Sequence, residues 1–439
     1  MRRTILTLIC LLTALAVCAA PALGESAAPR GPGRPGRART TASPTPEPTQ
    51  RPSVSPVGQG TPGHNTLILV DGGPNTADPD GLRFDAALLA LENLSGSVEK
   101  GRLGAIVFSD GGCVTYGPVD LGADLAEVEA ALAAPLRAAA VTDEPADIMP
   151  ALRAARRLIY GFGPNDETDL LMFISEADGW VMNPEPDSAA AELIADITAA
   201  GARLYPVYLT GEGLDARTLE TLIRAESDAE AAGRVTAATP VEERFQVPYA
   251  GIARAAVNLT FEPERKGALQ QVTLTDPEGA AHTLWDAAGA HPQPGLSVRD
   301  GGSYLLMTVT DPQPGDWTLS VAGENVPVDA LVRLDHGLRL NVSADSFIDF
   351  GSAQRVTAWF DTDRDLTGLY DQSAATLQLY APGEIEPAQT LEMALENGRY
   401  TAEFTPDRLG IWTGRVVVEN PWLRKTADSL AFEIGRAHV

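Results

Sequence analysis

Cysteine, histidine and catalytic motifs are scarce in this chain of 439 residues, and each shortage excludes a class of protein. Cys10 and Cys18 lie in a leader that we expect to be removed, so Cys113 is left alone and no disulfide can form within the mature chain. The five histidines are isolated, and no zinc-protease, serine-hydrolase or phosphate-loop motif occurs. The sequence therefore predicts a protein that is not an enzyme and that relies on apolar cores for stability.

Positive charge is also in short supply, since 33 Lys and Arg face 59 Asp and Glu and leave a formal net charge of −26. Such a surface repels phosphates, which excludes nucleic acid as a partner. It suits a protein outside the cell, where divalent cations are abundant. A requirement for solubility alone would explain the charge equally well.

The first 24 residues have the pattern of an export signal. Arg2 and Arg3 give a positive start, residues 5–20 are apolar, and small residues at 22–24 precede a cleavage point before Glu25. We therefore expect an extracellular or cell-surface location.

Two further segments are not expected to belong to any domain. Residues 25–63 are rich in Pro, Gly, Ser, Thr and Arg without apolar periodicity, which predicts a disordered linker. Residues 434–439 resemble the translation of a sequencing adapter, so we interpret them as a non-native tail. We expect the natural chain to continue to a membrane anchor that this tail has replaced.

Strand-like apolar runs alternate with helical periodicity across residues 64–250. We expect strands at 66–71, 103–109, 112–117, 169–175, 203–209 and 234–238, and helices at 81–94, 123–134, 145–160, 188–200, 215–226 and 240–250. The run 169–175 is almost entirely apolar, as in a strand buried on both faces. The alternation predicts an α/β doubly wound parallel sheet with helices on both faces.

After about residue 255, short alternating strands separated by Pro, Gly and Asp replace the helical pattern, which is typical of β-sandwiches. A weak repeat places a proline, a tyrosine and a tryptophan in each of two copies: Pro277, Tyr304 and Trp317, then Pro382, Tyr400 and Trp412. We expect the tyrosine and tryptophan of each copy to point into a sandwich core. The repeat predicts two all-β domains, at 255–330 and 332–432, with one larger sheet domain as the alternative.

Two strands of the predicted sheet end in acidic loops. Strand 66–71 runs into Asp71-Gly-Gly-Pro-Asn75, and strand 169–175 runs into Ser175-Glu176, with Asp178 two places further on. Loops at the carboxyl ends of parallel strands converge on one crevice, so these loops would form an oxygen-rich site suited to a hard cation. The same side chains would equally cap the turns and helices that follow, and both interpretations stay open here.

In the order of its elements, the segment 64–250 resembles a von Willebrand factor A (VWA) domain, whose family carries a metal-ion-dependent adhesion site. The family pattern is Asp-x-Ser-x-Ser, a Thr from a second loop and a late Asp, and the matching positions here are Asp71, Asn75, Thr142 and either Glu176 or Asp178. Gly73 replaces the first Ser and brings no hydroxyl, and a tight turn explains it better. The resemblance implies a degenerate site for Ca²⁺ or Mg²⁺, and the flexible coordination of Ca²⁺ fits it better.

The two sandwich regions resemble the immunoglobulin-like domains that often follow such a domain in bacterial surface proteins. Together these resemblances imply a non-enzymatic, adhesion-type protein displayed on a β-sandwich stalk, with a protein ligand or an envelope component as its partner. A carboxylate of that partner would complete the coordination of the cation. The alternative is a structural or sensory subunit of a membrane-associated complex that binds no metal.

A second acidic stretch, Asp361-Thr-Asp363-Arg-Asp365, begins like a calcium loop. Leu366 stands where such a loop requires Gly, so we expect an acidic hairpin turn instead.

Overall fold

The computed structural model describes residues 64–75, 78, 80–95, 101–109, 112–120, 122, 125–139, 141–143, 146–163, 167–174, 188–209, 214, 233–384 and 386–435. They belong to one compact unit, Ser55–Val439. The predicted signal, the predicted linker and the predicted helix 215–226 lie outside the described residues. Of the residues described, 52% are in strands and 20% in helices. No helix among them has the length and apolar character needed to cross a membrane.

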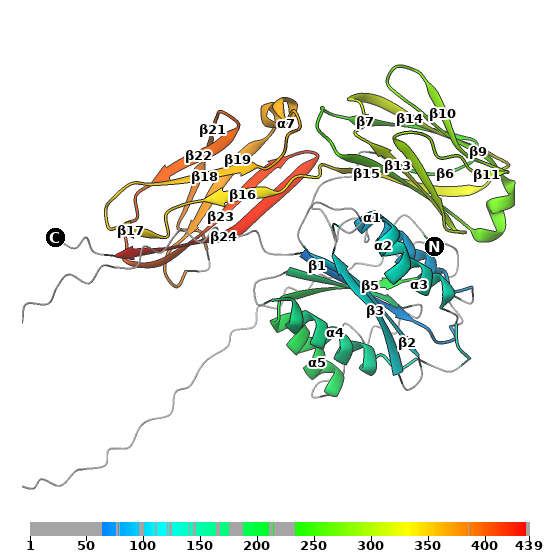
Figure 1. Cartoon of the computed structure of the whole chain (residues 1–439), viewed down its shortest axis with the longest axis horizontal. Coiled ribbons are helices and arrows are strands. Elements are labelled where there is room, and N and C mark those ends of the chain that lie inside the picture. Colours follow the sequence, from blue (N-terminus) through cyan, green and yellow to red (C-terminus); the bar gives the residue numbers. More distant parts are fainter. Residues whose placement is uncertain are drawn as a thin grey trace, which may run out of the picture. The chain divides into compact units, whose positions relative to one another are not determined.

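A five-stranded sheet organises the first part of the described chain (Figure 1). Its order is β3-β2-β1-β4-β5. The strands are β1 (His64–Asp71), β2 (Arg102–Ser109), β3 (Gly112–Asp120), β4 (Glu167–Ile174) and β5 (Ala202–Tyr208). Four of them are parallel, whereas β3 runs antiparallel to β2 at the edge.

Helices cover both faces of this sheet, which is why the middle of β1 (67–70) and the end of β4 (170–174) are apolar and buried. One face packs against α1 (Leu82–Leu94), α2 (Leu125–Val128), the π-helix Glu129–Ala133 and α3 (Ala134–Ala138), and the other against α4 (Met149–Phe162) and α5 (Ala189–Ala199). Alternate residues of β1 serve the two faces: Ile68 and Val70 point to the α1 side, and Leu67 and Leu69 to the α4 side. The predicted helices at 81–94, 145–160 and 188–200 are confirmed to within a few residues.

The first β-sandwich consists of two five-stranded sheets, β11-β10-β9-β14-β7 and β12-β13-β8-β15-β6. Its strands are β6 (Gly233–Ala238), β7 (Val241–Val247), β8 (Arg254–Phe261), β9 (Leu269–Thr275), β10 (Ala281–Asp286), β11 (Gly289–Ala290), β12 (Leu296–Asp300), β13 (Tyr304–Thr310), β14 (Gly315–Gly323) and β15 (Pro327–Asp335), with a 3₁₀ helix at Pro263–Ala268.

The second sandwich pairs the sheet β16-β18-β22-β21 with the sheet β17-β24-β23-β19-β20. Its elements are β16 (Leu340–Ser343), β17 (Phe347–Asp349), β18 (Gln354–Phe360), α7 (Thr367–Gln372), β19 (Ala374–Tyr380), β20 (Gln389–Glu392), β21 (Ala394–Glu396), β22 (Arg399–Phe404), β23 (Gly410–Asn420) and β24 (Leu423–Gly435). Strand β24 extends two residues into the predicted tail, and Ile434 is buried in it.

The sequence repeat corresponds to a repeated piece of structure. The indole nitrogens of Trp317 and Trp412 each donate to the carbonyl four residues earlier, at 3.0 and 3.1 Å. Gly315 and Gly410 have φ angles of 131° and 119°, and a Cβ on either would press against the ring of Pro277 or Pro382, so both positions require glycine.

The two repeated tyrosines are placed differently. Tyr400 lies inside the second sandwich, as predicted. The prediction for Tyr304 is wrong, because its ring packs among residues of the α1 side rather than in the sandwich core.

The predicted fold class is wrong for the chain as a whole, which is predominantly β. The α/β sheet is not fully parallel, because β3 is antiparallel. The predicted helix 240–250 is strand β7, and the predicted strand 234–238 is β6; both belong to the first sandwich, where they pair with β14 and β15. The physical reason is the alternation in residues 241–247, where Phe245 and Val247 are buried and Arg244 and Gln246 are exposed.

The outer face of sheet β12-β13-β8-β15-β6 packs against α1, so α1 is buried on almost all sides. Ala256, Leu306 and Leu331 share one apolar cluster with the leucines of α1. Polar groups pair across the same contact. Asn93 donates to Asn258 at 2.7 Å, and the hydroxyl of Tyr304 donates to Glu92 at 3.0 Å.

Candidate functional site

The loop between β1 and α1, described at 72–75 and at Asp78, begins at the carboxyl edge of the sheet. The Asp71 carboxylate accepts a hydrogen bond from the Gly73 amide at 2.7 Å, an arrangement that folds the chain back on itself. The Gly72 amide donates to the Phe108 carbonyl at 2.7 Å and ties the loop to the end of β2. The backbone of this loop is therefore anchored from its first residues.

A buried guanidinium holds the rest of this loop together. Arg83, in the first turn of α1, is fully buried. It donates to the carbonyls of Asp71 and Gly73, and to the Asp78 carboxylate at 2.7 Å. A fully desolvated charge is tolerated only when it is paired and hydrogen-bonded in this way.

Asp78 completes the network from the other side. Its carboxylate is also fully buried and accepts from the Leu82 amide at 2.7 Å and the Arg83 amide at 3.2 Å. Both are amides that the first turn of a helix leaves without a helical partner, so Asp78 caps α1 while it neutralises Arg83. Sequence reasoning missed both residues. The one available signal was an arginine embedded in the apolar run Leu82-Arg83-Phe84.

The structure brings Thr142, which the adhesion-site resemblance selects, to this loop. Its amide and its hydroxyl both donate to the Gly72 carbonyl, at 2.7 and 3.0 Å. Two segments that are 70 residues apart in the chain thus meet beside Asp71. Asn75 lies in the same loop and is partly exposed. Glu176 and Asp178 lie outside the described residues, so the late acid stays a prediction.

The packing of the loop explains Gly73. A Cβ at this position would lie 2.7 Å from the backbone nitrogen of Ala146 and 3.2 Å from the Asp71 carboxylate. No side chain fits there without movement of backbone, so the serine of the adhesion-site pattern has no room. The tight turn expected at this glycine is confirmed.

The described residues hold only part of the predicted metal site, because Glu176 and Asp178 are not among them. No group of three or more His, Cys, Asp or Glu in this part of the chain is placed to hold a cation. The Asp71 carboxylate is engaged by the Gly73 amide, and two loop carbonyls accept from the Arg83 guanidinium. The charge of that guanidinium is balanced by the buried Asp78 carboxylate. Among the described residues, Arg83 is therefore the group that connects the parts of this loop.

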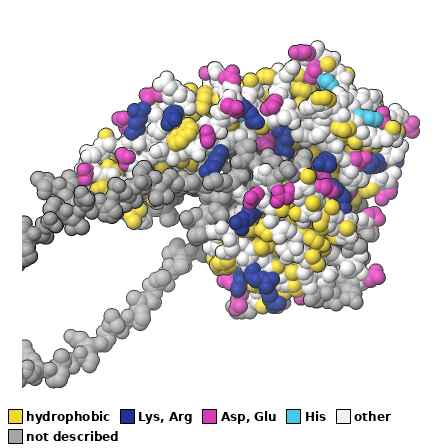
Figure 2. Space-filling view, viewed as in Figure 1, with side chains coloured by type: hydrophobic (Ala, Val, Ile, Leu, Met, Phe, Trp, Pro, Cys, Tyr) yellow, Lys and Arg dark blue, Asp and Glu magenta, His cyan; other side chains and the backbone are white. Residues whose placement is uncertain are grey.

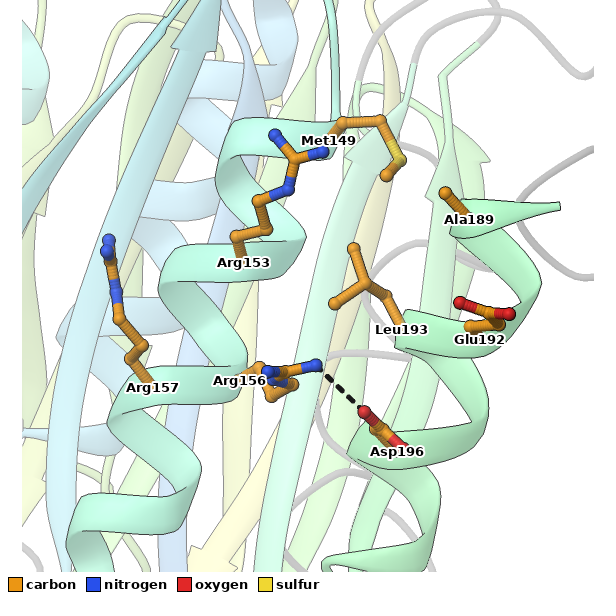
Figure 3. Close-up of a pocket in the computed structure, with 8 residues that line it drawn as sticks. All are labelled: Met149, Arg153, Arg156, Arg157, Ala189, Glu192, Leu193 and Asp196. Carbon is orange, nitrogen blue, oxygen red and sulfur yellow. Dashed lines mark hydrogen bonds and ion pairs between the residues drawn. The ribbon is translucent and has the colours of Figure 1, made fainter.

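A groove of about 340 Å³ between α4 and α5 is a separate feature (Figure 3). Met149 and Leu193 line it together with arginines of α4 and acids of α5, and Arg156 pairs with Asp196 at 2.8 Å. Arg153 and Arg157 also line the groove, and Arg157 extends from the side of α4 that faces away from α5. Among the residues that line the groove there is no nucleophilic side chain beside a base, so the lining does not support a catalytic role.

The acidic stretch 361–365 forms neither a calcium loop nor the expected hairpin. The Asp365 carboxylate accepts from the amide and the hydroxyl of Thr367, at 3.0 and 2.7 Å, and starts α7. The bond from the Thr367 amide lowers the pKa of Asp365. The prediction of a hairpin is wrong, because the three carboxylates lead into a helix.

Comparison with known proteins identifies no family. No family model and no curated protein matches the chain. Similar solved structures include an engineered protein (13% identity, TM-score 0.18, covering 23% of this chain and 20% of that one). Another is the PKD domain of a peptidase from a Thermoplasmatales archaeon (13% identity, TM-score 0.15, covering 22% of this chain and 93% of that one). A third is a protein from Corynebacterium diphtheriae described as membrane anchored (10% identity, TM-score 0.19, covering 47% of this chain and 53% of that one). The chain spans a fifth of the engineered protein, and at these TM-scores the matches establish no shared fold.

Proposed function

We propose that the chain is an exported, non-enzymatic binding protein that recognises a protein or envelope partner through the β1–α1 loop without needing a divalent cation. The observation that carries this proposal is the buried Arg83, which donates to two loop carbonyls and to Asp78. The guanidinium is buried and paired with Asp78, and it holds the loop carbonyls so that the loop keeps its shape without an added cation.

A loop held in this way is suited to binding, because its shape exists before the partner arrives. Ordering a flexible loop on binding costs affinity, and a preorganised loop avoids that cost. Thr142 adds to the organisation by fixing the Gly72 carbonyl from a second segment. Exposed atoms of the two segments then form one surface at the carboxyl edge of the sheet, where ligands of α/β sheets bind.

The competing candidate is cation-assisted binding, and it rests on the closeness of Asp71 and Thr142. Both belong to the residues that the adhesion-site resemblance selects. In that case a cation would sit above the loop, and residues from the segment 175–180 would complete its shell. The two candidates make opposite predictions about added metal.

The test is a titration of the chain from Glu25 onward with Ca²⁺ and Mg²⁺, following the melting temperature and the binding to isolated cell envelopes. We expect no rise in melting temperature at millimolar ion, and envelope binding that persists in EDTA and falls about tenfold in Asn75→Ala. Stabilisation by Ca²⁺ that disappears in Asp71→Asn would establish the competing candidate. Absence of envelope binding in every condition would refute both.

A further inference from the structure

A different surface of the α/β part has the properties of a docking edge. Strand β3 is the end strand of its sheet and, among the described strands, pairs with β2 alone. Val114 in its middle is 54% exposed, and Thr115 is exposed as well. A Cβ built on Gly112 would meet nothing within 4 Å, so the space beside the start of the strand is open. An end strand of this kind presents unpaired backbone donors and acceptors.

The first five residues of β3 carry none of the usual protection of an edge. Natural sheets block their edges with charged side chains, prolines or bulges. Residues 112–116 read Gly-Cys-Val-Thr-Tyr, and both the proline and the register shift against β2 come later, at Pro118 and between Leu103 and Ala105. A segment of this length suffices to pair with an extended peptide.

A basic stripe borders this edge. Arg153, Arg157 and Tyr160 are spaced four and three residues apart on α4 and therefore share one side of the helix. Arg153 and Arg157 are exposed, and Tyr160 is 63% exposed. Figure 2 shows basic side chains gathered on the surface where Figure 1 places α4. On a chain with a net charge of −26, this is a local reversal of sign.

The stripe and the edge are neighbours in space. Cys113 and Thr115 are paired with Phe108 and Ile106, so they lie on the sheet face that α4 covers. Helix α4 contacts β3 directly, and the charge of Arg157 acts against the rise that burial causes in the pKa of the Cys113 thiol. Side chains of an added strand on this face would come to lie beside the arginines.

We propose that the open edge of β3 accepts an extended acidic segment of a partner protein as an additional strand of the sheet. Backbone hydrogen bonds to residues 112–116 supply the pairing, and every second side chain of the segment faces the α4 side. Carboxylates at those positions bind Arg153 and Arg157, and an apolar group packs on Tyr160. A second copy of the chain is disfavoured here, because it would set the same arginines against each other.

The probe that tests this is a labelled decapeptide of alternating threonine and glutamate, with alternating threonine and lysine as its counterpart. We expect the acidic peptide to bind in fluorescence anisotropy and to protect amides of β3 from hydrogen exchange. Arg157→Glu and Arg153→Glu should each weaken binding about tenfold or more. Arg244→Glu, an exposed arginine on β7, provides the matched control and should leave binding within about twofold.

Three outcomes would overturn the proposal: no binding of the acidic peptide at about 1 mM, equal binding of the lysine peptide, or binding unaffected by Arg157→Glu. Unchanged melting temperatures identify variants that are correctly folded. Asp71→Asn should not alter peptide binding, so a failure at this edge is separable from a failure of the function proposed for the β1–α1 loop.

Discussion

Stability should fall as the pH drops from 7 to 4, and one buried histidine should account for much of the loss. His336 is 4% exposed, and its Nε2 lies 2.8 Å from the hydroxyl of Tyr249. That hydroxyl oxygen accepts from the amide of Asn420 at 3.1 Å, so its own proton is directed to Nε2. The imidazole ring is therefore held neutral, and a proton on Nε2 would break this chain of hydrogen bonds.

The size of the effect follows from the pKa. Burial, reinforced by the positive charges of Lys425 and Arg333 and opposed by Asp335, lowers the pKa of His336 from 6.5 to about 4. The unfolded chain therefore binds a proton between pH 6.5 and 4 that the folded chain does not bind. The stabilisation is fully present above pH 6.5 and is lost as the pH falls through this window. The difference in pKa corresponds to about 3 kcal/mol.

Urea unfolding of the wild type and of His336→Gln at several pH values between 7 and 4 measures this contribution. The variant loses a buried contact at every pH, so the informative quantity is the change in unfolding free energy across the range. That change should be smaller in the variant by about 2–3 kcal/mol. Asp85 and Glu92, whose pKa values burial raises, contribute equally to both proteins and cancel. His291→Gln, at a partly exposed site where the ring pairs with Asp286, is the control. Parallel pH profiles for wild type and His336→Gln would refute the reasoning.

Three further predictions concern α1 and the loop before it. Arg83→Met should lower the unfolding free energy by about 3–5 kcal/mol in chemical denaturation, because it leaves the Asp78 carboxylate buried without its partner. The control variant Arg355→Met, at an exposed ion pair, should lower it by less than about 1 kcal/mol. Asn93→Ala should cost about 1–3 kcal/mol, and a double-mutant cycle with Asn258→Ala should show coupling; additive losses would contradict a bond between the two. Gly73→Ser should lower the melting temperature and add no Ca²⁺ affinity, since the new side chain collides with backbone; a gain in Ca²⁺ affinity would contradict this account.

Local sequence patterns were sufficient to predict the secondary structure of much of the α/β part. Apolar runs identified β1, β2 and β4, and helical periodicity over residues 81–94 identified α1. They failed at residues 241–247, where a sequence with many helix-compatible side chains also alternates with the period of a strand. Pairing with β14, which lies more than 60 residues later in the chain, decides between the two, and no local pattern contains that information.

The candidate site also has some features that could be predicted from the sequence and others that could not. Thr142 was selected only through the adhesion-site resemblance, and the structure places it at the loop that begins with Asp71. The role of Arg83 could not be predicted, because a single arginine in an apolar run gives no indication of which carbonyls it will meet. Tyr304 was misplaced for a related reason: its strand belongs to a sheet that is covered on its outer face by a helix from another part of the chain. The assignments of Glu176 and Asp178 stay predictions.

Helix α1 packs against both the α/β sheet and the first β-sandwich. This restricts where the polypeptide can be cut into stable fragments. A fragment that stops before β6 would leave Leu82, Leu89 and their neighbours facing water on the flank that Ala256 and Leu306 now cover. A fragment that starts at β6 would uncover the opposite side of the same contact. Expression of either half should give aggregation-prone material, and any ancestor that exchanged modules would have had to pass on this helix and its covering sheet as a pair.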